Sequence, residues 1–145
     1  MKKRGITTLW LLMVALVMMA KSYTVKSPNG QLTAQVEVGT VIKYSLKDAS
    51  QQLVLPSAIA LKTDRGTWGE NSHLRRAVKT THRGQIAAFA YKRNEVSDCY
   101  NQLRLQFKEG FDLIFRLYDE GMAYRFASTL KSEVTINDEQ AQMRF

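Results

Sequence analysis

The sequence predicts an all-β fold, an antiparallel β-sandwich of about eight to ten strands. Short segments with alternating apolar and polar residues follow one another along most of the chain, as between Leu32 and Val38. A period of two residues is typical of strands with one buried face. Clusters of turn residues separate these segments, and no segment shows helical periodicity with capping residues. Together these features favour two packed sheets over any helical or mixed fold.

Turn residues divide the chain into its predicted strands. Pro56 is expected to end a strand, because proline cannot donate to a ladder of hydrogen bonds. The stretch from Thr63 to Arg76 is the least regular, and we expect a loop, or two short strands around one. In chain order, the predicted strands are Tyr23–Ser27, Gln31–Val38, Val41–Leu46, Gln51–Leu55, Ala58–Leu61, Val78–His82, Gln85–Tyr91, Asn101–Phe107, the two strands of a hairpin from Phe111 to Ser128, Glu133–Ile136 and Gln142–Phe145.

The hairpin is the most distinctive of these elements. Two aromatic-rich runs are separated by a three-residue loop ending in Gly121, which is expected to take a positive φ. Pairing of Tyr118 with Met122 would then place Arg116 opposite Tyr124. Both faces are largely apolar, so we expect the hairpin at the centre of a sandwich or under a cover on its second face. With the preceding strand, it forms a three-stranded antiparallel meander.

The first 20 residues are typical of a secretory signal. A basic stub, residues 2–4, precedes an apolar run from Ile6 to Ala20. The run is shorter than the roughly 20 residues that span a bilayer, and cleavage after Ala20 fits a signal peptide. The bulky Met18 leaves an uncleaved anchor as the alternative. We therefore expect residues 21–145 to be one domain, exported across the inner membrane to the periplasm and free of the membrane after cleavage.

Composition excludes several other functions. The basic residues are scattered through the strands, which argues against a nucleic-acid partner, because such a face needs a cluster of charge. The single Cys99 allows no internal disulfide and is interpreted as a small hydrophobe just before a strand, with no reason to call it reactive. His73 and His82 lie nine residues apart without a neighbouring Cys or His, so no metal ligands are assigned.

One run of residues carries a family resemblance. The segment Phe115–Phe126 is similar to the F-R-x-Y-D-D-G-x-A-Y-R-F stretch in the N-terminal domain of glycoside hydrolase family 97, secreted α-glucosidases and α-galactosidases. Matching stretches lie upstream in the same order, and the resemblance covers residues 23 to 145. The supporting matches are Ser27–Gly30, Leu55–Leu61 and Tyr100–Leu103.

The resemblance implies a galactose-mutarotase-like super-sandwich that continues beyond this sequence. In the family, the N-terminal domain runs on before a (β/α)8 barrel with the catalytic machinery. A barrel takes about 250 residues, so this chain cannot contain one. Residues 143–145 read as the start of an apolar strand, which also predicts a sandwich that is incomplete at its C-terminus. No catalytic or metal-binding residue carries over to a position here, and calcium is implied only for the full-length enzyme.

Two functions are compatible with this sequence. The chain is either the non-catalytic N-terminal part of a secreted glycoside hydrolase, with the missing barrel in cis and an α-linked oligosaccharide as its partners, or a free-standing periplasmic sugar-binding or structural β-sandwich. It is expected to be inactive alone in both cases. Glycoside hydrolysis needs two carboxylates about 5 to 9.5 Å apart across the scissile bond. The adjacent Asp119 and Glu120 lie in a tight turn, where backbone capping is the better interpretation.

Four residues are candidates for contact with sugar or with another domain. Trp68, the one aromatic residue in a polar loop flanked by glycines, is a possible stacking platform, with plain packing as the favoured alternative. Arg116, Tyr118 and Tyr124 are expected to share a face that meets the rest of a full-length enzyme. Buried guanidinium groups are costly unless paired, so Arg116 and Arg125 should each have a polar partner or reach an interface.

Overall fold

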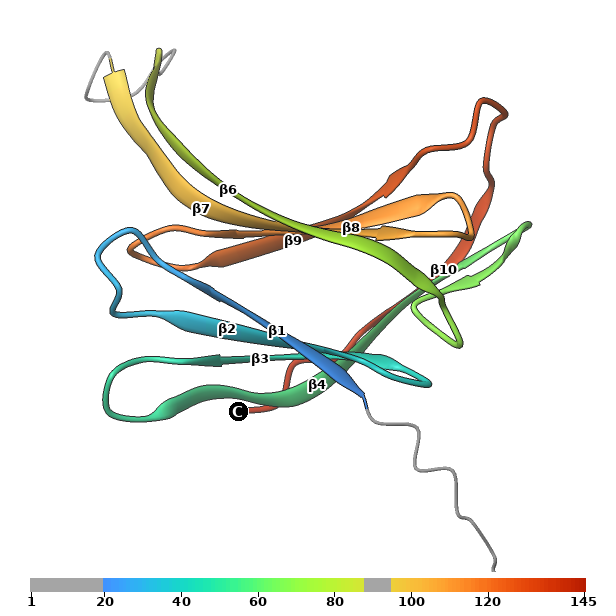
Figure 1. Ribbon diagram of the computed structural model, residues 1–145, viewed down its shortest axis with the longest axis horizontal. Coiled ribbons are helices and arrows are strands. Elements are labelled where there is room, and N and C mark those ends of the chain that lie inside the picture. The colour runs from blue at the N-terminus through green and yellow to red at the C-terminus, as the bar shows by residue number, and fades with distance from the viewer. Residues whose placement is uncertain (1–19, 88–94) are drawn as a thin grey trace, which may run out of the picture.

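The computed structural model describes residues 20–87 and 95–145, and these form two antiparallel sheets that face each other (Figure 1). Residues 1–19 of the predicted signal peptide and the end of the predicted strand Gln85–Tyr91 lie outside the described residues. In the described ranges no helix is long and apolar enough to cross a membrane. The all-β sandwich predicted from the sequence is confirmed.

The first sheet has six strands. Its order is β1-β2-β3-β4-β10, and the short β5 also pairs with β4. Alternation of buried and half-exposed residues along β2 agrees with the period of two in its sequence. The strands are β1 (Lys21–Lys26), β2 (Thr33–Val38), β3 (Ile42–Lys47), β4 (Gln52–Thr63), β5 (Gly66–Trp68) and β10 (Ile136–Ala141).

Pro56 does not end a strand, contrary to the prediction. Strand β4 continues through it, and the register against β3 shifts at this point. Tyr44 pairs with Ser57 whereas Leu46 pairs with Val54, so Leu55 and Pro56 together oppose one residue of β3. A bulge of this kind leaves a strand residue outside the ladder, which is where a proline is tolerated within a sheet.

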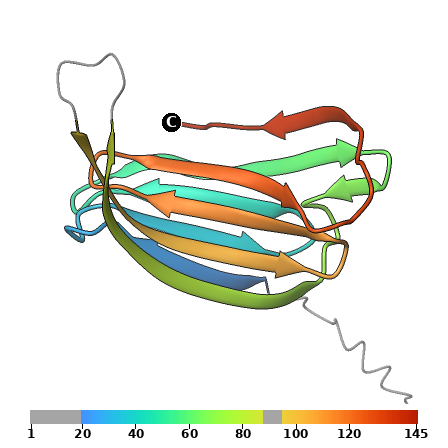
Figure 2. The same cartoon turned by 90° about the horizontal axis from the view of Figure 1, so that it is seen from above.

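The second sheet has four strands in the order β6-β7-β8-β9, an antiparallel meander (Figure 2). Two predicted strands merge into the single β6, and β7 begins six residues before the predicted start at Asn101. Cys99 therefore lies within β7 rather than before it. The strands are β6 (Leu74–Ala87), β7 (Glu95–Phe107), β8 (Phe111–Leu117) and β9 (Met122–Ser128).

The register of the β8–β9 hairpin differs by one residue from the predicted one. Leu117 pairs with Met122, and the N–H of Tyr118 donates to the carbonyl oxygen of Gly121 at 2.8 Å. The turn thus has four residues, and Gly121 is not among the described residues with positive φ. Because side chains alternate, a shift of one residue exchanges the faces. Arg116 lies opposite Ala123, and Tyr124 lies opposite Phe115 on the other face.

The core lies between the two sheets and is rich in aromatic rings. Phe111 stacks on Trp68 at 5.0 Å and on Phe107 at 4.5 Å between ring centroids. From the four-stranded sheet, alternate residues of β7 and β8 point inward and are fully buried: Leu103, Leu105, Leu113, Phe115 and Leu117. This aromatic core links β5, β7 and β8, so the irregular segment after Thr63 is fixed by packing.

The C-terminal segment returns to the first sheet. The strand predicted at Glu133–Ile136 starts later, because β10 spans Ile136–Ala141 and pairs with β4. The strand predicted at Gln142–Phe145 is present only as an isolated bridge between Arg144 and Leu55.

Candidate functional site

The outward face of the four-stranded sheet carries an arginine on each of its strands. Inward-pointing residues of β7 and β8 fill the core, so their neighbours in sequence point away from it. The strand registers place Arg104 and Arg125 on either side of Ile114, with the other two arginines in adjacent rows. We call this surface the arginine face, and define it by Arg76, Arg104, Arg116 and Arg125.

Asp112 is the buried acidic partner on the arginine face. Its side chain is only 2% exposed. Both the Nε and an Nη of Arg104 donate to one carboxylate oxygen, with the Nε bond at 2.7 Å. A buried carboxylate needs such a charged donor, because desolvation of an unpaired charge is very costly. The pair joins β7 to β8 and is occupied within the fold.

Arg116 belongs to a cluster around the ring of Tyr100. Its guanidinium carbon lies 4.4 Å from the ring centroid, and its Nε donates to Gln102 at 3.0 Å. His82 stacks on the same ring at 4.9 Å, and the ring of Tyr118 is tilted against it at 5.3 Å. Arg116 thus has the polar partner that its position requires, and with Tyr118 it presents an aromatic and cationic surface.

The other two candidate residues do not join this surface. Tyr124 lies on the inward side of the sheet, where its ring meets those of Tyr44 at 5.6 Å and Phe115 at 5.8 Å. Burial, with the nearby charge of Glu139, raises the pKa of the Tyr124 hydroxyl. Trp68 is 3% exposed and stacked in the core, so its ring offers no platform to a sugar in this structure. The shift in hairpin register is what separates Tyr124 from Arg116.

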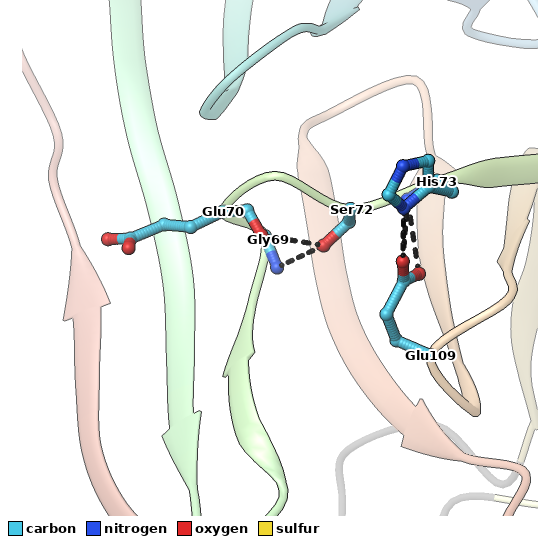
Figure 3. Close-up of polar contacts among 5 residues, drawn as sticks. All are labelled: Gly69, Glu70, Ser72, His73 and Glu109. Carbon is cyan, nitrogen blue, oxygen red and sulfur yellow. Dashed lines mark hydrogen bonds and ion pairs between the residues drawn. The ribbon is translucent and has the colours of Figure 1, made fainter.

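A polar contact that the sequence did not indicate joins His73 to Glu109 (Figure 3). The backbone N–H of His73 donates to the two carboxylate oxygens at 2.9 and 3.1 Å, and its Nδ1 lies 2.7 Å from Oε1. Burial raises the pKa of Glu109, and the hydrogen bonds from His73 outweigh this, so the pKa is lowered. The two residues are far apart in sequence, and no local motif marks them as partners.

The neighbouring Ser72 does not complete a catalytic arrangement with His73. Its Oγ accepts from the N–H of Gly69 at 3.1 Å and donates to the carbonyl of Glu70 at 3.3 Å (Figure 3). A serine nucleophile needs its hydroxyl on the base, whereas this hydroxyl is held by the backbone of the turn. The His73–Glu109 pair therefore fastens the start of β6 to the β7–β8 turn.

Two further carboxylates, those of Asp119 and Asp98, make structural contacts. Asp119 accepts from the N–H of Asn29 at 2.8 Å and so joins the β8–β9 turn to the β1–β2 turn. Asp98 lies 3.3 Å from Nε2 of His82. No group of three His, Cys, Asp or Glu side chains suited to a metal ion occurs among the described residues.

Comparison with known proteins finds a matching family model and a related enzyme. A family model described as glycosyl-hydrolase 97 N-terminal matches residues 25–145. The chain is 31% identical to a retaining alpha-galactosidase of Bacteroides thetaiotaomicron, and the match covers all of this chain and 22% of that protein. The chain thus spans about a fifth of the length of this relative.

Solved structures share the fold. A glycoside hydrolase family 97 enzyme of Pseudoalteromonas sp. strain K8, in complex with acarbose, matches with a TM-score of 0.70 and 17% identity, over 81% of this chain and 19% of that one. A beta-arabinopyranosidase matches with a TM-score of 0.76 and 24% identity, over 85% of this chain and 21% of the other. With the family match over residues 25–145, the chain belongs to the N-terminal domain family of glycoside hydrolase 97.

Proposed function

We propose that this chain is the non-catalytic N-terminal β-sandwich part of a secreted glycoside hydrolase that acts on α-linked glucosides or galactosides. The observation that carries the proposal is the family match over residues 25–145 of a chain that spans only 22% of a retaining alpha-galactosidase. In this proposal the chain is one part of a longer polypeptide. The remainder of that polypeptide holds the catalytic barrel and its calcium, and this chain supports the barrel.

The arginine face is the surface that we assign to this support. Arg76 and Arg125 are exposed, whereas Arg104 is occupied by Asp112 and Arg116 by Gln102 and Tyr100. Exposed arginines are enriched in protein interfaces, because guanidinium groups bind carboxylates with two hydrogen bonds and stack on rings. The chemistry of this face therefore favours a carboxylate-bearing surface of the same polypeptide.

Charge reversal on the arginine face tests the supporting role. In the longer polypeptide, Arg125→Glu should lower the melting temperature and the hydrolysis of nitrophenyl α-glycosides together, because a carboxylate would meet carboxylates across the interface. Lys43→Glu is the matched control, since Lys43 is exposed on β3 of the opposite sheet. Equal melting temperature and activity in the Arg125→Glu and Lys43→Glu variants would contradict the role of this face.

Export is tested by the mature N-terminus. We propose that residues 1–20 direct the chain to the periplasm and are then removed, a role supported by the basic stub and apolar run of the sequence. Mass spectrometry of the periplasmic fraction should find a protein that begins at Lys21. Recovery of the intact N-terminus in the membrane fraction would instead identify an uncleaved anchor.

A further inference from the structure

Strands β6 and β7 extend as a two-stranded arm beyond the rest of their sheet (Figure 1). Strand β8 ends at Leu117, opposite Asn101, whereas β6 and β7 remain paired as far as Ala87 and Glu95. We define the arm as residues 83–87 and 95–99. A cross-strand apolar pair lies on it, with Ile86 55% and Val96 41% exposed. A lone two-stranded ribbon is marginally stable in water, and no segment within the described ranges covers this exposed apolar pair.

A hollow of about 870 Å³ lies between the arm and the β8–β9 turn. It lies on the side of β7 where β8 would continue if the chain did not turn back after Leu117. Among the residues that the structure describes, the backbone of β7 along residues 95–100 has a strand partner on its β6 side alone. The residues that line the hollow are Glu95, Val96, Ser97, Cys99 and Tyr118–Ala123.

We propose that this hollow receives a β-strand from the longer polypeptide, which pairs with β7 over residues 95–100 and covers Val96. The inference rests on the proposed function, because it takes the occupant from sequence beyond this chain. An open strand edge is a template for pairing, and folded proteins leave few such edges uncovered. The retaining alpha-galactosidase is long enough to include such a further strand, since this chain spans only 22% of its length.

The charge of the hollow specifies the kind of strand. Glu95 and Glu120 both line it, and Asp119 lies between Tyr118 and Glu120 in the turn. A strand with lysine or arginine toward this wall would complement these carboxylates. A second copy of the chain would bring its own arm with the same acidic residues, and like charges placed opposite each other are destabilising. The observations therefore favour a basic strand in cis over self-association.

Amide hydrogen exchange in the longer polypeptide tests the pairing. The amides of residues 95–100 that face away from β6 should exchange about 100-fold more slowly than in an open edge, as expected for paired backbone groups. Alkylation of Cys99 by iodoacetamide, followed on its own peptide by mass spectrometry, should be slowed in parallel. A protected Cys99 beside fast-exchanging amides would mean a cover without strand pairing, and would overturn the proposal.

Gly121 provides a matched pair of variants. A Cβ added at this residue meets no atom within 4 Å, and the residue lines the hollow. Gly121→Trp should block the strand and restore fast exchange and fast alkylation, whereas Gly121→Ala should keep both slow. Slow exchange in the tryptophan variant would place the occupant elsewhere, and protection that requires a dimer in sedimentation would assign it to a second copy; both results overturn the proposal.

The same samples separate this inference from the proposed function. A longer polypeptide with protected β7 amides but no hydrolysis of any α-glycoside would contradict the function and support the strand. An active enzyme whose β7 amides exchange as an open edge would support the function and overturn the strand.

Discussion

The pair of Arg104 and Asp112 is a residue-scale feature that joins β7 to β8 in the four-stranded sheet. Asp112 is buried, whereas Arg104 reaches the surface with 45% of its side chain exposed. Removal of one partner of a buried pair leaves an uncompensated charge, which costs about 3 kcal/mol. We expect Arg104→Ala to lower the free energy of unfolding by about this amount in urea titration.

Arg125→Ala is the control for that measurement. Both alanine variants are measured in this chain alone, where the proposed contact of the arginine face is absent. Arg125 is exposed on the same face, and loss of a surface arginine changes stability by about 0.5 kcal/mol or less. Equal urea midpoints for the two alanine variants would show that Asp112 finds compensation elsewhere.

The second residue-scale prediction concerns pH. Burial raises the pKa of Glu109 in the folded chain. The hydrogen bonds from His73 lower it by more, so the net pKa lies below its ordinary value. A lowered carboxyl pKa contributes stability that is present above the ordinary value of about 4.3 and is lost as pH falls through the lowered folded value. Wild type should therefore lose about 1 kcal/mol more than Glu109→Gln between pH 6 and 3, a small figure because the carboxylate is one-third exposed.

Urea midpoints at the two pH values measure this difference. Parallel losses in wild type and in the glutamine variant would mean that the contact between His73 and Glu109 does not persist in solution.

At the scale of elements, the hairpin shows what the sequence could and could not predict. The strands are evident from two apolar runs with a turn between them, and both are present. The register was wrong by one residue because Leu113, Ile114 and Phe115 are all apolar, so the pattern did not mark one face as the inner one. The turn geometry decided the register, and with it the separation of Arg116 from Tyr124.

Gly69, between β5 and β6, makes the element-scale prediction. Its φ is +101°, and an added Cβ would lie 2.6 Å from the carbonyl oxygen of Ile59. That backbone belongs to β4, so it cannot give way as a flexible side chain would. Gly69→Ala should lower the free energy of unfolding by about 2 kcal/mol or more, because strain of backbone conformation and contact add.

Gly121→Ala is the matched control for Gly69→Ala. The added methyl group meets nothing within 4 Å, and it reduces the freedom of the unfolded chain. We expect this variant to be unchanged or slightly more stable in urea titration. A destabilisation equal to that of Gly69→Ala would contradict the close approach of Gly69 to β4.

At the scale of the whole molecule, local pattern predicted the architecture and missed the contacts between distant segments. Alternation and turn residues predicted a sandwich and the meander of β7, β8 and β9. The merging of two predicted strands into β6 depends on its long pairing with β7, which no local pattern contains. Likewise, Trp68 looked like a loop residue because its stacking partner, Phe111, lies far along the chain. The arm and its hollow likewise depend on the pairing of β6 with β7 and on the position of the β8–β9 turn, neither of which a local sequence pattern contains.

The most direct test of the account is an activity comparison between the purified chain and the longer polypeptide. Both are assayed with calcium on nitrophenyl α-glucoside and nitrophenyl α-galactoside. We expect hydrolysis of at least one substrate by the longer polypeptide and none by this chain, because a catalytic (β/α)8 barrel takes about 250 residues, more than the 145 residues of this chain. Turnover by the chain alone, or an in-frame continuation without activity on either substrate, would contradict the account.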